Sequence, residues 1–453
     1  MIGQTTLDFR ANAADAIKDG SMRQAMRQAT DTFGTRRTVA MESIDFSALR
    51  EKASAIRMEV LDNLPAYLER FTVQATQSGA QVHRATDGAS ANAIIAEILR
   101  SRNVKMVAKG KSMVSEETHL NAHLEQEGFE VVETDLGEYI IQLEGETPSH
   151  IIVPAIHKNR QQVGRLFADR LGVDYSEDPQ VLTRIARKVL REKFLAADAG
   201  ISGANFAIAD SGSLVLFTNE GNGRMVTSVP PLHIAILSIE KILPSLADLP
   251  TFMRLLPRSA TGQMLTSYVS ILTGTRKADD VTGAGELHIV LLDNGRSGIL
   301  EGDCREMLKC IRCGACMNVC PVYRTVGGHA YGWTYPGPMG IVLTTLLTGM
   351  AGSHPLVDAS TLCGACNDAC PVKVPLQEMI LRQRNRRVSE GFSPATLSMG
   401  MSLFGAAVKW PMLFSFGERL ASRFWSILRL VGGENVAGRL PRPAKIPFSR
   451  RMP

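Results

Sequence analysis

The chain has 453 residues, of which 45% are hydrophobic and 21% charged, so a mainly disordered protein is excluded and about three domains are expected. The net charge is only +5 and aromatic residues make up 6%, which disfavours nucleic-acid binding. The N-terminus lacks an apolar signal segment, and no run reaches the roughly 18 apolar residues of a membrane-spanning helix, so we expect a cytoplasmic protein.

Residues 1–80 are expected to form a helical region. Apolar residues recur there three and four positions apart, as at Leu49, Ala53, Ile56 and Val60, with charged residues between them. That spacing places the apolar side chains on one face of a helix.

Residues 81–298 alternate between short β-rich runs and helical patterns, among them 116–126 and 179–197. The predicted strands are 104–108, 129–133, 139–143, 150–153, 206–209, 214–218, 233–237 and 287–292. Strands that alternate with helices predict an α/β domain with a largely parallel sheet. Glycine-containing polar segments predict loops at 221–223 and 293–295.

Residues 391–453 are predicted to be an amphipathic C-terminal region with a flexible tail. The stretch 397–430 is apolar but interrupted, for example by Lys409 and Pro411, so it is expected to contact a partner or, peripherally, a membrane surface. The Pro- and Arg-rich segment 441–453 has too few apolar residues to pack.

All eight cysteines fall between residues 304 and 370, whereas a disulfide-stabilised secreted protein spreads them along the chain. The run from Cys310 to Pro321 is C-x2-C-x2-C-x3-C-P, the pattern of bacterial ferredoxins, and Cys363 to Pro371 repeats its last three cysteines. Structural zinc sites instead show two separated C-x2-4-C pairs. Residues 299–390 are therefore predicted to be a ferredoxin-type domain with two [4Fe–4S] clusters.

The spacing also predicts which cysteines share a cluster, because the fourth cysteine of each ferredoxin run binds the other cluster. The predicted ligands of cluster 1 are Cys310, Cys313, Cys316 and Cys370. The predicted ligands of cluster 2 are Cys320, Cys363 and Cys366.

Cluster 2 lacks one cysteine, because Ser360 stands where the repeat would place it. The site is completed by Ser360, by Cys304, by water or by a partner's side chain, or it holds a three-iron cluster. Cys304 lies outside the register of the repeat, which favours a spare buried thiol over a ligand.

These motifs resemble the lactate-utilisation protein B family, iron–sulfur subunits of a bacterial L-lactate oxidation system. The ferredoxin-type half is similar at 310–324 (CIRCGACMNVCPVYR), 327–338 and 362–375. The preceding half is similar at 109–117, 133–143, 154–160, 190–224 and 291–297.

The resemblance implies electron transfer in the oxidation of L-lactate to pyruvate, alongside two other lactate-utilisation proteins and an electron acceptor of unknown identity. It also implies a lactate-utilisation domain similar to sugar-phosphate isomerases and CoA-transferases, followed by an α-helical two-cluster domain that uses the seven cysteines named above. Two alternative functions stay open, a catalytic lactate-binding subunit of the dehydrogenase complex and a structural scaffold of that complex.

The α/β domain offers polar candidates but no predicted catalytic residue. Lys109, Lys111 and Ser112 precede a predicted helix whose N-terminus attracts anions, although Lys105 replaces the first glycine that a phosphate loop requires.

A second polar loop contains Glu220, Asn222 and Arg224, and either Arg224 or Lys111 suits a carboxylate such as lactate. His157 and His329 lie in polar or Gly-rich settings, where ordinary hydrogen bonding is favoured over catalysis.

Overall fold

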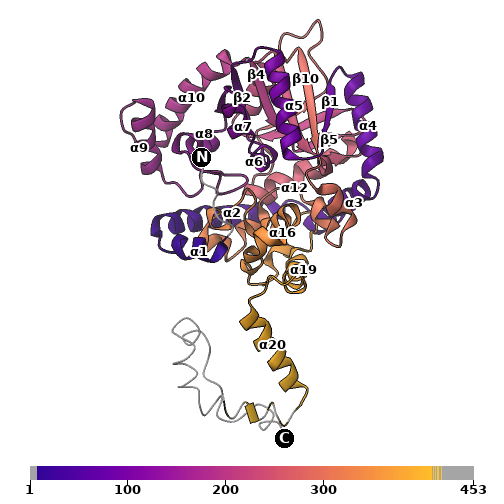
Figure 1. The fold of residues 1–453 in the computed structure, drawn as a ribbon. Coiled ribbons are helices and arrows are strands. Elements are labelled where there is room, and N and C mark those ends of the chain that lie inside the picture. Colours follow the sequence, from indigo (N-terminus) through magenta and orange to yellow (C-terminus); the bar gives the residue numbers. More distant parts are fainter. Residues whose placement is uncertain (1–7, 411, 413, 415, 418–419, 421–453) are drawn as a thin grey trace. The chain divides into compact units, whose positions relative to one another are not determined.

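The computed structural model describes residues 8–410, 412, 414, 416–417 and 420 (Figure 1). The chain divides into two compact units, Met1–Arg384 and Asn385–Pro453. The first unit contains both β-sheets and all eight cysteines.

Six parallel strands form the main sheet, in the order β1-β10-β7-β4-β2-β3 (Figure 1). Their bounds are β1 (Gln81–Ala85), β2 (Met106–Lys109), β3 (Glu130–Glu133), β4 (Ala199–Gly203), β7 (Leu232–Ser238) and β10 (Glu286–Leu292). The predicted α/β fold with a largely parallel sheet is confirmed. Because all strands run in one direction, their carboxyl ends share one edge, where such sheets place ligands.

Both faces of the main sheet are buried, which explains its continuous apolar strands. On β10, Val290 and Leu292 pack among the helices on one face, whereas Ile289 and Leu291 pack toward α4 and the second sheet on the other. This period of two divides a single apolar run between two cores.

A smaller sheet has the order β8-β5-β6-β9. Its strands are β5 (Phe206–Ile208), β6 (Ser213–Thr218), β8 (Ile242–Leu243) and β9 (Tyr268–Leu272). β6 pairs antiparallel with β5 and with β9, and β8 pairs parallel with β5. The sequence analysis predicted strands at β5 and β6 but placed them in the same sheet as the others, whereas they belong to this second sheet.

Four helices precede the main sheet, which agrees with the helical pattern of the N-terminal residues. They are α1 (Phe9–Ala16), α2 (Gly20–Glu42), α3 (Phe46–Asp62) and α4 (Leu64–Gln77). Asp side chains accept hydrogen bonds at the starts of the first three, from Ala11, Met22 and Ala48 amides.

Further helices connect the strands. They are α5 (Gly88–Ser101), α6 (Met113–Glu117), α7 (Leu120–Gln126), α8 (Leu136–Glu144), α9 (Arg160–Leu171), α10 (Pro179–Ala196), α11 (Asn222–Ser228) and α12 (Leu249–Thr261). The predicted helix 179–197 corresponds to α10, whereas 116–126 is divided between α6 and α7.

Two predicted strands are wrong. Residues 139–143 lie in α8, because the Asp135 carboxylate caps the helix at the Gly137 and Glu138 amides and Gly145, with φ of 76°, ends it. Residues 150–153 form no strand but bends at 150–152, since the amides of Ile152 and Val153 donate to Nδ1 of His150 and not to a neighbouring strand.

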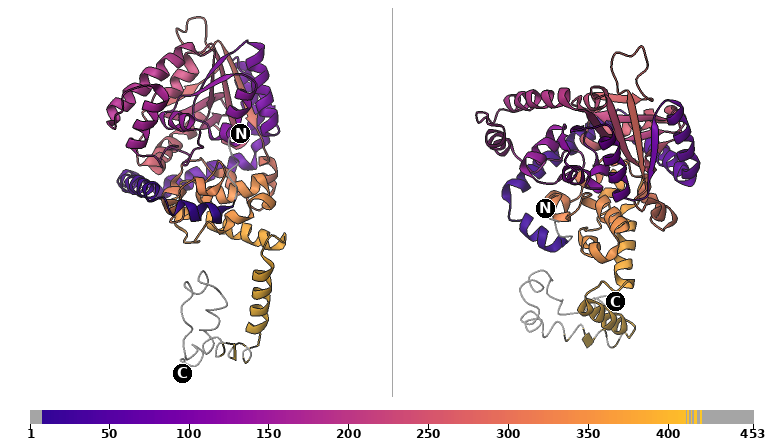
Figure 2. Two further views of the ribbon diagram at one scale, coloured as in Figure 1. Left: turned by 60° about the vertical axis from the view of Figure 1, so that its left-hand side comes forward. Right: turned by 45° about the horizontal axis from the view of Figure 1, so that its top comes forward.

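The cysteine segment is built from short helices around its loops. They are α13 (Arg296–Glu301), η3 (Arg305–Lys309), α14 (Ala315–Asn318), α15 (Tyr323–Val326), η4 (His329–Tyr331), α16 (Gly337–Thr348), α17 (Met350–Ser353), η5 (His354–Asp358), α18 (Ala365–Ala369) and α19 (Leu376–Ser389), which crosses the boundary between the units. Figure 2 shows the N-terminal helices beside this segment, and α1 packs on η4, α2 on α15 and α3 on η3.

The second unit contains α20 (Ala395–Val408), where Met399, Met401, Leu403 and Phe404 are exposed. Of the predicted interfacial stretch 397–430, residues 411, 413, 415, 418–419 and 421–430 lie outside the described residues, as does the whole predicted tail 441–453. Partner or membrane contact by this stretch therefore stays a prediction.

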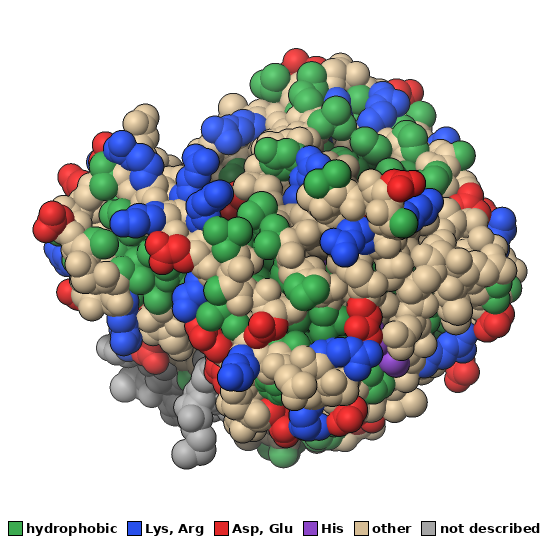
Figure 3. Space-filling model, turned by 90° about the horizontal axis from the view of Figure 1, so that it is seen from above, with side chains coloured by type: hydrophobic (Ala, Val, Ile, Leu, Met, Phe, Trp, Pro, Cys, Tyr) green, Lys and Arg blue, Asp and Glu red, His purple; other side chains and the backbone are tan. Residues whose placement is uncertain are grey.

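Among the described helices, none combines the length and apolar character needed to cross a bilayer. Figure 3 shows basic and acidic side chains interspersed over the described part of the face seen from above. The exclusion of a nucleic-acid partner rests on composition and stays a prediction.

Candidate metal centre

Two loops of the cysteine segment have the same backbone form. In the loop from Cys310 to Cys316, Arg312 has φ of 57° and Gly314 has φ of 76°. In the loop from Ser360 to Cys366, Leu362 has φ of 56° and Gly364 has φ of 82°. Each loop turns through these left-handed residues into a short helix, α14 or α18.

The first cavity brings together the four cysteines predicted for cluster 1. Its empty volume is about 370 Å³, and its cysteine lining is Cys310, Cys313, Cys316 and Cys370. Cys370 comes from the second cysteine run, so both runs contribute to this cavity.

The second cavity brings together the three cysteines predicted for cluster 2. Its empty volume is about 280 Å³, and Cys320, Cys363 and Cys366 line it together with Ser360. Cys320 comes from the first cysteine run, while Cys363 is exposed to solvent. The second cavity is therefore the one with a cysteine at the molecular surface.

The thiols suit a soft metal or an iron–sulfur cluster. Burial raises the pKa of Cys313 to about 12. Burial, together with the neighbouring thiols of Cys310, Cys313, Cys366 and Cys370, also raises the pKa of Cys316. Thiolates gathered there need a positive charge close to the sulfur atoms, which a bound metal supplies. The donor set therefore fits the predicted group.

Backbone amides and arginines surround the first cavity. The Arg312 amide donates to Cys310 Sγ at 3.4 Å, and the Val374 amide donates to Cys370 Sγ at 3.3 Å. Arg57, 1% exposed, donates to the carbonyl oxygens of Ile242 at 2.7 Å and Leu308 at 2.8 Å, which fixes η3 immediately before Cys310.

The N-terminal helices hold the second run in place. Arg37 on α2 donates to the Ala369 carbonyl at 3.2 Å, and Arg50 on α3 donates to the Asn367 carbonyl at 2.9 Å. These bonds satisfy carbonyls at the end of α18, directly before Cys370. Both arginines also bring positive charge toward the first cavity.

A buried ionic network behind the loops was not foreseen from the sequence. Arg296 makes two bonds to Glu117, at 2.8 and 2.7 Å, and its Nε lies 2.9 Å from Glu240. Arg312 Nη2 lies 3.2 Å from the other Glu240 oxygen. Despite burial, Arg296 and Arg312 lower the pKa of Glu240 to about 2. The network joins the carboxyl edge of the main sheet to the first cysteine loop.

Cys304 lies apart from both cavities. It is buried, its Sγ accepts a hydrogen bond of 3.4 Å from Gln383 Nε2, and it is absent from both cavity linings. This placement agrees with the predicted spare thiol.

The predicted anion-binding lysines already have protein partners. Lys109 is fully buried and bonds to Glu133 and, at 3.2 Å, to Glu116, whereas Lys111 Nζ donates to the Ile152 carbonyl. Ser112 Oγ accepts from the Ser115 amide at 3.3 Å and caps α6. These bonds give all three residues structural roles.

The predicted polar loop after β6 is not assembled as one ligand site. Glu220 accepts from the Leu136 amide at 3.2 Å, and Asn222 is buried in α11. Arg224 is exposed and stacks over the Tyr268 ring, 5.8 Å from its centroid. Arg224 is thus the predicted carboxylate ligand that stays open to solvent.

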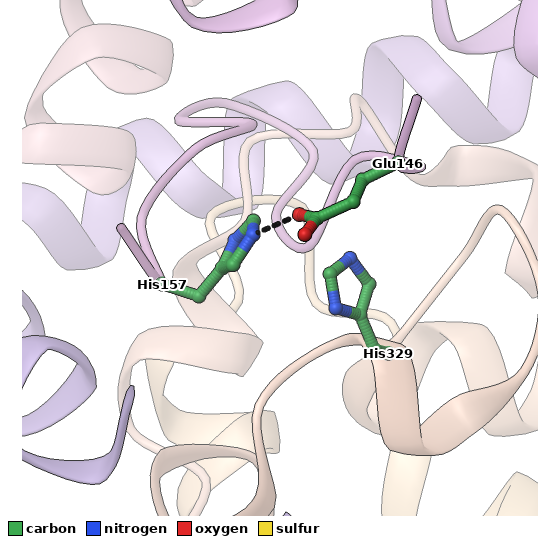
Figure 4. Close-up of side chains that lie close together, drawn as sticks. All are labelled: Glu146, His157 and His329. Carbon is green, nitrogen blue, oxygen red and sulfur yellow. Dashed lines mark hydrogen bonds and ion pairs between the residues drawn. The ribbon is translucent and has the colours of Figure 1, made fainter. Parts of the chain in front are cut away.

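His157 and His329 lie together with Glu146 (Figure 4), and their ligand atoms come within 4.8 Å of one another. His157 Nε2 and Lys158 Nζ donate to the two Glu146 oxygens at 2.7 and 2.6 Å, while His329 Nε2 donates to the Thr147 carbonyl at 2.7 Å. His157 and Lys158 thus hold the Glu146 carboxylate, and the bond from His329 to Thr147 links this segment to η4.

Models of two known families match separate parts of the chain. A model of the LUD domain matches residues 68–292, and a model of the 4Fe-4S dicluster domain matches residues 306–374. The cysteine segment is therefore an iron–sulfur domain.

Relatives match almost the whole chain. "Lactate utilization protein B" of Bacillus velezensis is 45% identical over 419 residues, covering 92% of this chain and 88% of that protein. The protein of that name from Bacillus subtilis is 44% identical over 416 residues (91% and 87%). An "uncharacterized electron transport protein" of Escherichia coli is 42% identical over 417 residues (92% and 88%).

Among solved structures, a DUF162 family protein from Deinococcus radiodurans is 14% identical and covers 51% of this chain and 98% of its own. The TM-score is 0.29, too low to assign a fold.

Proposed function

Because the chain belongs to the lactate utilization protein B family, we propose that it transfers electrons in the oxidation of L-lactate to pyruvate. The observation that supports this most is the gathering of seven cysteines from two runs around two cavities, four at one and three at the other. Such an arrangement suits electron relay better than a single structural metal site.

The proposed ligands follow the two cavities. Cys310, Cys313, Cys316 and Cys370 would hold one [4Fe–4S] cluster, and Cys320, Cys363 and Cys366 would hold the second. When bound, such clusters supply one-electron transfer at a potential set by nearby charge, hydrogen bonds and solvent.

The surroundings of the two sites differ in ways that suit a relay. Arg37, Arg57 and Arg312 bring positive charge to the first site, which favours extra negative charge there. The second site has exposed Cys363, so it is the site that a redox partner can approach. We assign electron exchange with partners to the second site.

The chain would work as a non-catalytic subunit of a lactate dehydrogenase complex in the cytoplasm, with two other lactate-utilisation proteins. The names of its relatives support membership in a lactate-utilisation system. The engagement of Lys109 and Lys111 by protein groups argues against a lactate carboxylate at those residues.

The proposal is tested by anaerobic purification, iron and sulfide analysis, and EPR of the oxidised and reduced protein. We expect about eight irons per chain, as two four-iron clusters require. Cys316→Ala should lose the first cluster and lactate-dependent electron flow with the partner proteins, whereas the matched control Cys304→Ala should keep both. A preparation that contains only zinc would refute the proposal.

Arg224 provides the test of a catalytic role. Arg224→Ala is expected to keep both clusters and full electron flow. If flow is lost while both clusters remain, the α/β domain binds substrate and the non-catalytic assignment is wrong.

A further inference from the structure

The second cavity contains an oxygen atom where the first contains a sulfur atom. In the first loop, the Arg312 amide donates to Cys310 Sγ at 3.4 Å. In the second loop, the Leu362 amide donates to Ser360 Oγ at 3.1 Å. Since the left-handed residues of the loops also correspond, Ser360 Oγ occupies the structural position of Cys310 Sγ.

Other polar side chains of the second cavity are less suited to complete it. Gln377 Nε2 donates to the Leu362 carbonyl at 2.7 Å, and the Gln377 amide donates to Asn367 Oδ1 at 2.9 Å. Thr361 also lines the cavity but is one residue out of register with Cys310. Ser360 is half-buried and belongs to the same lining as Cys320, Cys363 and Cys366.

The backbone at Ser360 is fixed from α19. Arg384 Nη2 donates to the Ser360 carbonyl at 2.7 Å, and its Nε donates to the Val357 carbonyl at 2.8 Å. Two parallel bonds from one planar guanidinium set the direction of the chain as it enters the loop. Arg384 is therefore a positioning residue, and its positive charge lies next to a serine that would have to lose a proton.

We propose that Ser360 Oγ is the fourth protein ligand of the second cluster, which then has three thiolates and one alkoxide. This inference rests on the proposed function. On binding, the Ser360 O–H bond breaks, an Oγ–iron bond forms, and the proton passes to solvent at the open side near Cys363. No electron is transferred in this step.

The test uses the full chain, purified anaerobically, with Ser360→Ala, Ser360→Cys and the control Thr361→Ala. Iron and sulfide content, EPR and the potential of each cluster are measured, and Cys363→Ala identifies the signal of the second cluster. Ser360→Ala should fall from about eight irons to about seven and show the EPR signal of an oxidised three-iron cluster. Thr361→Ala should match the parent protein.

Ser360→Cys should keep all irons and raise the potential of the second cluster, because a soft thiolate replaces a harder alkoxide that favours oxidised iron. The first cluster should be unchanged in every variant at Ser360. If the Ser360→Ala protein does not accumulate, the potential of the second cluster in Ser360→Cys provides the test.

An unchanged potential in Ser360→Cys overturns the inference, as does full iron content in Ser360→Ala or an equal loss in Thr361→Ala. A three-iron cluster in the anaerobic parent protein also overturns it. These results leave the proposed function intact, whereas a parent protein without iron–sulfur clusters removes both.

Discussion

Replacement of Arg296 by Met tests whether the buried ionic network stabilises the join between the sheet and the cysteine loop. The Arg296 and Glu117 side chains are both 0% exposed, as is Glu240. Removal of one partner from a buried pair costs about 3–5 kcal/mol, because it leaves uncompensated charge. Glu117 keeps its bonds from Asn294 at 2.6 Å and Tyr335 at 2.7 Å, and Glu240 keeps Arg312, so we expect the lower end, about 3 kcal/mol.

The assay is urea unfolding of the protein under anaerobic conditions, monitored by circular dichroism, which gives the free energy of unfolding. Arg305→Met is the control, because Arg305 is 38% exposed and pairs at 2.6 Å with Asp62, which is 53% exposed. Such a surface pair contributes about 0–1 kcal/mol. The reasoning is refuted if Arg296→Met costs no more than Arg305→Met.

A second substitution checks the cause of the loss. In the Arg296→Met variant, the carboxylates of Glu117 and Glu240 have both lost their bond to Arg296. Adding Glu117→Gln removes one of these two buried negative charges, so it should recover part of the lost stability. If the double variant instead lost a further amount of unfolding free energy, similar to that lost by Arg296→Met, side-chain packing and not charge would explain the destabilisation.

Two further predictions concern pH and packing. Burial lowers the pKa of His233 from 6.5 to about 4, so the unfolded chain binds the extra proton and stability falls as pH drops below about 6.5. Between pH 7.5 and 5.5, His233→Gln should therefore lose roughly 1.4 kcal/mol less unfolding free energy than the parent protein; equal losses would contradict this. A Cβ at Gly340 would lie 1.7 Å from the Tyr335 carbonyl oxygen, so Gly340→Ala should yield little folded protein. Gly298→Ala meets nothing within 4 Å and should leave the melting temperature unchanged or raise it, and an equal loss of folded protein in both would contradict the packing argument.

The sequence predicted well the features that depend on local spacing. The cysteine spacing anticipated the two groups that line the cavities, because in the ferredoxin pattern the first three cysteines of a run share one loop and the fourth binds the other cluster. The apolar runs of β7 and β10 anticipated buried parallel strands for the same local reason.

Features that depend on distant partners were missed. β4 has the sequence AGISG, a weak strand signal, yet a Cβ at Gly200 would lie 2.0 Å from the Val226 carbonyl oxygen. Gly200, which weakens the strand signal in the sequence, is thus required by the close packing of α11 against β4. Likewise, Glu117 and Arg296 are 179 residues apart, so no local pattern could reveal their pairing.

The exchange of residues between the two runs has a consequence for biosynthesis. The linings of both cavities include residues that precede position 321. The lining of the first cavity also includes Cys370 and residues after it, and the lining of the second extends to Gln377. Neither cavity exists until the ribosome has passed these positions, by which time the whole α/β region has been made. Whatever fills the cavities can be enclosed only after both cysteine runs have been made, so loading follows the synthesis of the α/β region.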